Sequence, residues 1–297
     1  MKKYLVLLSV YAGMSTVVLA QKVDVEAHRG GIGLMPENTI AAMIHAVDLG
    51  VNTLEMDLSV SADRQLVVSH DPYMNRNFVT KPDGSGITAA EEKSLALYTM
   101  PYDSIRKYET GLRFYSKFPD QKKIKTHKPL ISDLIDSVET YVKEKGLTPV
   151  HYNIEIKSGV KNDNVSSPVY TEFVDLAIPL LLSKRLGDRL VVQCFDVRAL
   201  NYMHQKYPQL ILSYLVGAKD NDLDVALGKL DFTPQVYSPN YTLVNAELVK
   251  QVHGKGMKIL PWTVDEEQDI TRMIELKVDG IISNYPNRVL NLVGKVK

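Results

Sequence analysis

The sequence predicts an α/β fold, and specifically a closed (β/α)8 TIM barrel. Eight short apolar segments with strand-like patterns follow one another along the chain, and helical segments separate most of them. This alternation implies parallel pairing with right-handed crossovers, and eight such units in roughly 250 residues fit this barrel. An open, doubly wound sheet is the competing architecture. The lack of a glycine-rich G-x-G-x-x-G turn after the first strand argues mildly against it.

The first 20 residues differ in composition from the rest of the 297-residue chain. A basic start precedes an uncharged apolar run that ends in small residues at Ala20. This pattern predicts a secretory signal peptide over 1–20 and therefore a periplasmic or secreted protein. A membrane anchor is the alternative, but the run is short for a span. We expect one domain over 21–297, with no stable membrane insertion after cleavage.

Charge and cysteine content exclude several classes of protein. Lys and Arg number 35, as do Asp and Glu, and loss of residues 1–20 removes two lysines and leaves a formal charge of −2. No basic block indicates binding to nucleic acid or to an anionic membrane. Cys194 is the single cysteine and lies in an apolar segment, so we expect a buried residue and no intramolecular disulfide. The oligomeric state stays open.

The first strand, at residues 23–27, runs into His28-Arg29-Gly30. The motif Pro36-Glu37-Asn38-Thr39 then opens an apolar helical pattern, which Gly50 ends as a C-cap. Thr39 or Asn38 can cap this helix, and the motif is expected to support the site rather than to do chemistry.

The second strand, at 53–60, alternates in polarity, so Glu55 and Asp57 share one face with Cα atoms roughly 6–7 Å apart. A further short strand at 66–69, which is not one of the eight, delivers His70-Asp71 to its end. The next stretch, 72–128, has no clear periodicity, and a loop of that length is usually functional or forms a small subdomain.

From residue 130 onward, strands and helices alternate. Pro179 should kink or interrupt the helix expected at 168–185. We expect strands at 150–157, 190–195, 209–216, 235–238, 257–263 and 280–283, and helices at 131–145, 168–185, 196–206, 222–229, 245–254, 266–276 and 286–293.

Four linked motifs carry a family resemblance: H-R-G at a strand end, P-E-N-T opening a helix, E-x-D on the next strand, and H-D after the following one. In this order and spacing they resemble the glycerophosphodiester phosphodiesterase family. Residues 278–286 resemble the last-strand signature of that family, although Ser283-Asn284 stands where Thr-Asp is common, and Cys194 where serine is common. The resemblance implies that 72–128 is an insertion between the second strand unit and its helix, and that it covers the barrel mouth.

Glu55, Asp57 and Glu155 are the candidate metal ligands. Three carboxylates suit a hard cation that takes oxygen ligands, and no histidine or cysteine has zinc-ligand spacing. The resemblance implies a divalent cation, Ca²⁺ or Mg²⁺, on these residues. A solvated outer face of an edge strand is the alternative for the acidic pair on the second strand, and a salt bridge to Lys157 is the alternative for Glu155.

The resemblance implies that His28 and His70 form an acid–base pair, which phosphodiester cleavage requires. Arg29 offers a planar fork that matches a phosphate, Lys157 is a second candidate cation, and Trp262 could form an apolar wall for substrate carbons. Core packing explains Trp262 equally well, and a single histidine at a strand end is more often structural. The structural interpretation applies to the other five histidines, at 45, 127, 151, 204 and 253.

The expected function is metal-dependent hydrolysis of glycerophosphodiesters to an alcohol and sn-glycerol 3-phosphate. One alternative is a phospholipase D- or C-like barrel acting on intact lipids, but 72–128 has no long apolar run. A second is a catalytically silent surface binding protein, although the whole implied site is present. A sugar-phosphate isomerase or aldolase barrel would usually carry a phosphate-binding glycine loop near strands seven and eight. The head group, the ion, direct or cyclic-phosphate chemistry, and which histidine is the acid stay open.

Overall fold

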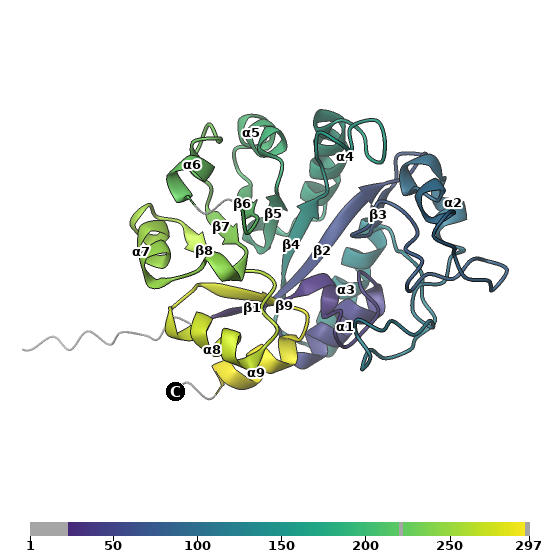
Figure 1. Cartoon of the computed structure of the whole chain (residues 1–297), viewed down its shortest axis with the longest axis horizontal. Coiled ribbons are helices and arrows are strands. Elements are labelled where there is room, and N and C mark those ends of the chain that lie inside the picture. The colour runs from purple at the N-terminus through teal and green to yellow at the C-terminus, as the bar shows by residue number, and fades with distance from the viewer. Residues whose placement is uncertain (1–22, 220–221, 295–297) are drawn as a thin grey trace, which may run out of the picture.

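The computed structural model describes residues 23–219 and 222–294, which form a barrel surrounded by helices (Figure 1). The predicted signal peptide lies outside the described residues. Within the described part of the chain, no helix is long and apolar enough to cross a membrane.

Eight parallel strands form the barrel wall in the order β8-β7-β6-β5-β4-β2-β1-β9. Backbone hydrogen bonds of 3.1 Å from Asp279 to Ile259 and from Ile282 to Pro261 join β9 to the β8 segment and complete the ring. The predicted eight-stranded architecture is therefore confirmed. The wall strands are β1 (Asp24–Ala27), β2 (Thr53–Val60), β4 (His151–Ile156), β5 (Leu190–Cys194), β6 (Ile211–Val216), β7 (Val236–Pro239), β8 (Lys258–Ile259) and β9 (Gly280–Ser283).

The helices around the wall begin and end within two residues of the predicted positions, because their caps are local in sequence. Thr39 accepts a hydrogen bond from the Ala42 amide, and Gly50 ends α1 with φ 85°. These helices are α1 (Ile40–Leu49), α3 (Ile131–Lys145), α4 (Tyr170–Ser183), α5 (Val197–Lys206), α6 (Leu223–Leu227), α7 (Ala246–Gly254), α8 (Glu267–Glu275) and α9 (Pro286–Val293).

Of the two expected effects of Pro179, an interruption of the helix is wrong, because α4 continues through this residue. Pro179 lies on the exposed side of the helix. Water can therefore bond the carbonyl group that loses its partner there.

Every residue of β2 is buried. Leu54, Met56 and Leu58 belong to the main hydrophobic core, whereas Glu55 and Asp57, on the other face, are each only 1% exposed. The acids therefore point into the barrel, and the alternative of a solvated outer face is wrong.

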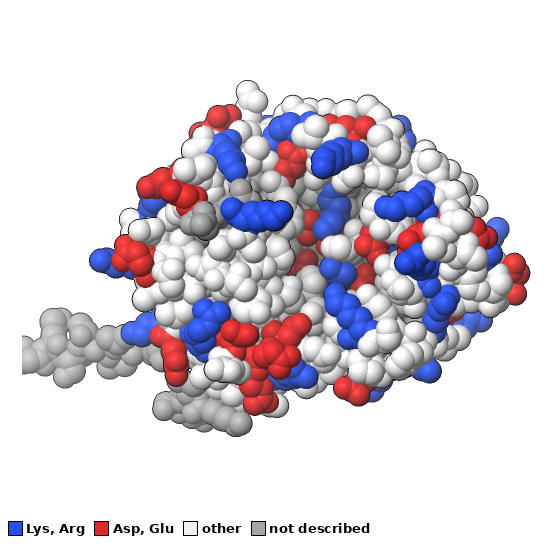
Figure 2. All heavy atoms as spheres, in the orientation of Figure 1, with Lys and Arg blue, Asp and Glu red and all other residues white. Residues whose placement is uncertain are grey.

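The segment 72–128 follows β3 (Leu66–Val68), which pairs antiparallel with β2. It contains the short helix α2 (Tyr102–Ile105) and packs on a separate apolar cluster. It lies beside β3 and α3 at one side of the barrel (Figure 1), and a hollow lined by charged side chains stays visible near the middle of the same face (Figure 2). The expected cover over the mouth is therefore only partial. Residues of this cluster are Val67, Met74, Phe78, Val79, Ile87, Leu97 and Ile105.

Candidate active site

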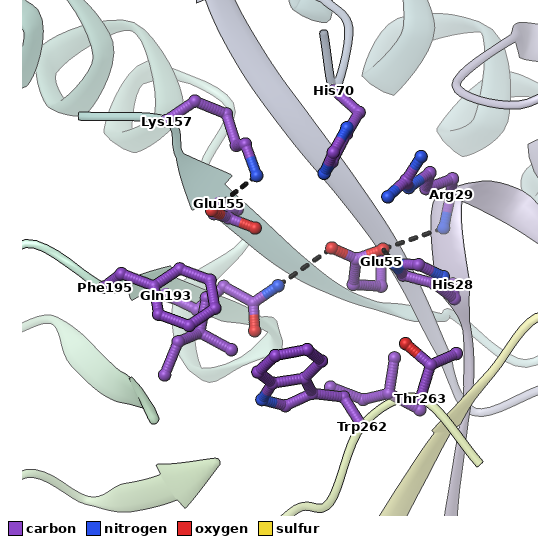
Figure 3. Close-up of a pocket in the computed structure, with 12 residues that line it drawn as sticks. His28, Arg29, Glu55, His70, Glu155, Lys157, Gln193, Phe195, Trp262 and Thr263 are labelled. Atoms are coloured by element: carbon purple, nitrogen blue, oxygen red, sulfur yellow. Dashed lines mark hydrogen bonds and ion pairs between the residues drawn. The ribbon is translucent and has the colours of Figure 1, made fainter. Parts of the chain in front are cut away.

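A cavity of about 160 Å³ opens where the barrel strands end (Figure 3). Seven of the eight predicted site residues line it, and Asp57 contacts two of them, Arg29 and Lys157. The structure thus brings together residues that the sequence spreads over more than 230 positions. The full lining comprises His28, Arg29, Glu55, His70, Glu155, Lys157, Gln193, Phe195, Leu215, Trp262, Thr263 and Ile282.

A tight turn at the end of β1 positions Arg29. Arg29 has φ 53° and Gly30 has φ 79°. At position 30 this positive φ is unfavourable for a residue with a Cβ atom, but glycine adopts it without strain. A Cβ atom on Gly30 would lie 2.7 Å from the Ala42 Cβ, so the turn also needs glycine for close packing on α1. In this conformation the Arg29 amide donates a 2.8 Å hydrogen bond to Glu55 Oε2.

The Arg29 guanidinium is oriented by two acids. Its Nη1 donates to Glu37 Oε2 at 3.2 Å, and its Nε lies 3.6 Å from Asp57 Oδ2. Asn38 donates to the same Asp57 oxygen at 2.9 Å. The Pro36–Thr39 motif therefore supports the site, as expected, by holding the groups that face the cavity.

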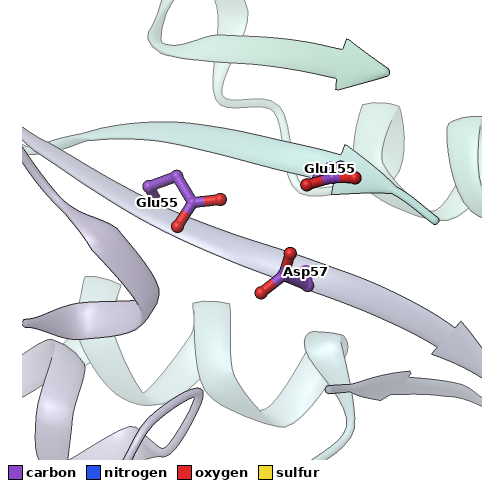
Figure 4. Close-up of side chains that lie close together, drawn as sticks. All are labelled: Glu55, Asp57 and Glu155. Carbon is purple, nitrogen blue, oxygen red and sulfur yellow. The ribbon is translucent and has the colours of Figure 1, made fainter. Parts of the chain in front are cut away.

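Glu55, Asp57 and Glu155 converge from two adjacent strands, β2 and β4 (Figure 4). Each offers one oxygen within 4.8 Å of the others, and all three are buried. Burial, with Asp57 as a like-charged neighbour, raises the pKa of Glu55, and burial also raises the pKa of Glu155. Such a cluster is costly unless a cation compensates the charge.

The residues fit a hard divalent cation. Asp57 Oδ1 is buried and has no hydrogen-bond partner among the described residues. Burial opposes its ionisation, but nearby His70 and Lys157 outweigh this cost and hold the pKa of Asp57 well below its usual range. Lys157 Nζ does form the alternative salt bridge, at 2.9 Å from Glu155 Oε1, yet Lys157 and Arg29 together bring only two positive charges to the three carboxylates. Oxygen donors alone suit Mg²⁺ or Ca²⁺.

His28 is held in one tautomer by a relay from β9. Its Nδ1 lies 2.6 Å from Asn284 Oδ1, and the Asn284 amide nitrogen donates to Asp265 Oδ2 at 2.6 Å. Asp265 thus fixes the amide orientation, so Nδ1 of His28 must carry the proton and Nε2 has a free lone pair. Burial, helped by the charge of Arg29, lowers the pKa of His28 to about 3.

His70 is oriented by its sequence neighbour. Its Nδ1 lies 3.0 Å from Asp71 Oδ1, and Asn75 donates to the other Asp71 oxygen at 2.6 Å. These hydrogen bonds outweigh burial and hold the pKa of Asp71 well below its usual range. Asp71 is therefore a carboxylate that binds the Nδ1 proton of His70 and leaves Nε2 for the cavity.

Two aromatic rings form one wall of the cavity (Figure 3). Phe195 and Trp262 pack edge to face with centroids 5.4 Å apart. Trp262 Nε1 donates to the Ser238 carbonyl at 2.9 Å. Trp262 therefore lies at the cavity, where the sequence left a choice between this wall and core packing.

Sequence reasoning missed Gln193, whose amide donates to Glu55 Oε1 at 2.8 Å. Asn153, on the same inward face of β4 as Glu155, lies deeper in the barrel and donates to Glu26 Oε2 at 2.8 Å. The strand register could have identified Gln193. It is the β5 partner of Glu155, so its side chain lies on the same inward face of the barrel.

A buried lysine also escaped sequence analysis. Lys128 is 4% exposed and donates to Ser69 Oγ at 2.8 Å. Ser69 in turn donates to the Asp71 carbonyl at 2.7 Å, next to His70. No periodic pattern in 72–128 marks this position, so nothing local predicted its burial.

A (β/α)8 barrel with a carboxylate cluster, two cations and two oriented imidazoles at its mouth defines a class of phosphoric ester hydrolase. The sequence model of the Glycerophosphoryl diester phosphodiesterase family matches residues 28–288. This chain belongs to that family.

Individual relatives agree with this assignment. A glycerophosphodiester phosphodiesterase of Caldanaerobacter subterraneus is 30% identical over 92% of this chain and 99% of its own. A Silicibacter pomeroyi structure of the same family has a TM-score of 0.82 at 28% identity, and the match covers 92% and 93% of the two chains. An Oleispira antarctica phosphodiesterase, solved with the product sn-glycerol-3-phosphate, shares the fold with a TM-score of 0.71 at 21% identity over 91% and 96% of the chains.

Proposed function

We propose that this enzyme hydrolyses glycerophosphodiesters to an alcohol and sn-glycerol 3-phosphate with the help of a divalent cation, Mg²⁺ or Ca²⁺. The observation that carries this proposal is the convergence of Glu55, Asp57 and Glu155 within 4.8 Å in the cavity that also presents both histidines. When bound there, the cation would polarise a phosphoryl oxygen and offset the charge that develops on it.

Arg29 and Lys157 are proposed to bind the phosphate. Arg29 Nε is buried and makes no hydrogen bond among the described residues, and its anchoring to Glu37 leaves part of the guanidinium fork for a ligand. Lys157, whose side chain is 22% exposed, adds a second positive charge above the acids (Figure 3). Charged donors held in place in this way stabilise a phosphoryl transition state without further reorganisation.

His28 and His70 are proposed as the acid–base pair. The free lone pair on His28 Nε2 suits it to take a proton, from water or from a glycerol hydroxyl group. His70 is proposed to donate a proton to the departing alkoxide, since its Nδ1 is hydrogen-bonded to the Asp71 carboxylate and its Nε2 is left for the cavity. Attack by water gives hydrolysis directly, and attack by the glycerol hydroxyl gives a cyclic phosphate first.

The predicted signal peptide and the domain division are also part of the proposal. Residues 1–20 direct export, and residues 21–297 form the mature enzyme in the periplasm or outside the cell. N-terminal sequencing of protein from cell fractions tests this: a mature chain starting near Gln21 in the exported fraction supports it, and an intact Met1 in the cytoplasm contradicts it.

The reaction is tested by release of sn-glycerol 3-phosphate from glycerophosphocholine, glycerophosphoethanolamine, glycerophosphoinositol and glycerophosphoglycerol. Vesicles of intact phospholipid and micelles of lysophospholipid serve as the competing substrates. Release from water-soluble diesters, well above release from lipids, supports the proposal. Preferred cleavage of lipids would support the phospholipase alternative, and no cleavage at all would support a silent binding protein.

A further inference from the structure

A second cavity, of about 190 Å³, adjoins the first at the end of β4. His70, Glu155, Lys157 and Phe195 line both cavities. The rest of its wall comes largely from the loop between β4 and α4. The residues found only in the second cavity are Ser59, Pro72, Ser158, Asn162, Ser166, Ser167 and Phe173.

Three of the shared residues, His70, Glu155 and Lys157, belong to the groups proposed to act on the phosphate. A phosphodiester has two alcohols esterified to one phosphorus atom. A phosphate bound between the two cavities can therefore direct one ester oxygen toward each cavity. His28, Arg29 and Trp262 line the first cavity only, whereas His70 also faces the second. The second cavity therefore lies where the alcohol protonated by His70 would leave.

The loop that forms the second cavity offers free hydrogen-bonding groups. The side chains of Asn162 and Ser166 are half-buried and make no hydrogen bond to the described part of the chain. Ser158 donates to Asp196 Oδ2 at 2.7 Å, and Ser167 donates to the Pro168 carbonyl at 3.1 Å, so both retain lone pairs that can accept. This set can both donate to and accept from hydroxyl groups.

The loop is held in shape without a ligand. The Asn162 carbonyl accepts three backbone amides, from Val165, Ser166 and Ser167, at 2.9 to 3.1 Å. Asp163 is fixed by Arg198 Nη1 at 2.8 Å. A binding surface that is already ordered loses little conformational entropy when a ligand binds.

The charges in this cavity disfavour a cationic head group. Glu155 is the single acid in its wall, and it is already bridged to Lys157 at 2.9 Å and belongs to the metal cluster. The two phenyl rings, Phe173 at 0% exposure and Phe195 at 41%, are too few for the aromatic cage that recognises quaternary ammonium groups.

We infer that the second cavity is the subsite for the leaving alcohol, and that it selects neutral polyols of the glycerol or inositol type over choline or ethanolamine. This inference rests on the proposed hydrolysis of glycerophosphodiesters. Asn162 and Ser166 are its specificity-determining residues, because a hydroxyl group can both donate to them and accept from them, whereas an ammonium group can only donate and a trimethylammonium group can do neither.

The test compares kcat/KM for glycerophosphoglycerol, glycerophosphoinositol, glycerophosphoethanolamine and glycerophosphocholine. We expect the wild-type enzyme to prefer the polyol diesters about tenfold or more, since each of several hydrogen bonds contributes roughly a factor of 2 to 12. Asn162→Ala with Ser166→Ala should remove most of that preference and leave the choline diester within about twofold. Val165→Ala, an exposed side chain of the same loop that does not line the cavity, is the matched control.

A second variant separates recognition from simple loss of structure. Asn162→Asp places a carboxylate in the cavity, so it should raise the relative kcat/KM for the two ammonium diesters. An equal loss for all four diesters in both variants, or a wild-type preference for choline, overturns the subsite assignment while release of sn-glycerol 3-phosphate still supports the proposed reaction. No release from any diester overturns the reaction itself and, with it, the subsite.

Discussion

The Arg29 backbone amide donates a 2.8 Å hydrogen bond to Glu55 Oε2. This contact links the turn that carries the proposed phosphate-binding guanidinium to the strand that carries two of the three candidate metal ligands. Because it uses the backbone, it does not depend on the Arg29 side chain and can persist in the Arg29→Lys variant. Phosphate binding and metal binding can therefore be perturbed separately.

Arg29→Lys should raise KM and lower kcat/KM by roughly 10- to 100-fold, since a charged hydrogen bond contributes about 1.5–3 kcal/mol and lysine lacks the planar fork. Divalent-ion affinity should change little. Steady-state kinetics and calorimetric ion titration measure the two effects, and Arg76→Lys, at an exposed position, is the control. An unchanged kcat/KM would exclude Arg29 from substrate binding.

His28→Gln and His70→Gln should each lower kcat by about 10²- to 10⁴-fold, the usual contribution of a positioned acid or base. His151→Gln, at the exposed start of β4 and the opposite end of the barrel, should be nearly neutral. Circular dichroism checks that each variant is folded. A folded His28 or His70 variant with near-wild-type kcat would refute the assigned role.

Asp57→Asn should weaken Mg²⁺ or Ca²⁺ binding at least tenfold, because among the three candidate ligands it removes the one carboxylate whose pKa lies well below its usual range. In the wild-type protein a saturating ion should raise the melting temperature, since it binds only the folded state, and the variant should lose that increase. Glu267→Gln, on the exposed face of α8, is the control. The same ion-induced shift in wild type and Asp57→Asn contradicts the carboxylate site.

The metal-free protein should lose stability as the pH falls from about 6.5 toward 3. The pKa of His28 is about 3 in the folded state and about 6.5 when unfolded. Between pH 6.5 and 3 the unfolded chain binds a proton at His28 that the folded chain does not. The stability contributed by neutral His28 is therefore complete above pH 6.5 and is lost as the pH falls toward 3. The effect is on the order of a few kcal/mol.

Urea unfolding of the wild type and His28→Gln in EDTA, at several pH values, measures this contribution. The difference between their unfolding free energies should shrink as the pH falls through this range. A difference that does not vary with pH would show that His28 has the same pKa in the folded and unfolded states, and would contradict the lowering of its pKa by burial.

Much of this organisation is encoded locally, and sequence could therefore predict it. The family and the barrel are confirmed because strand periodicity, helix caps and the Arg29–Gly30 turn depend on near neighbours. Glu55 and Asp57 share a face by strand geometry alone, and Glu155 joins them because parallel strands place their carboxyl ends together.

The remaining contacts depend on tertiary structure. The bond between His28 and Asn284 joins residues 256 positions apart and exists only because β9 pairs with β1. The burial of Lys128 depends on the packing of 72–128 against β3, which has no periodic signal. Sequence therefore identified the groups that face the cavity better than those that orient them.

Metal-dependent release of sn-glycerol 3-phosphate by residues 21–297, the proposed mature protein, is the central prediction. The measurement is the rate of release from a glycerophosphodiester mixture, first in excess EDTA and then after addition of Mg²⁺ or Ca²⁺. We predict that EDTA abolishes release, that one of these ions restores it, and that Asp57→Asn resists restoration. Release that continues unchanged in EDTA would contradict the role given to Glu55, Asp57 and Glu155.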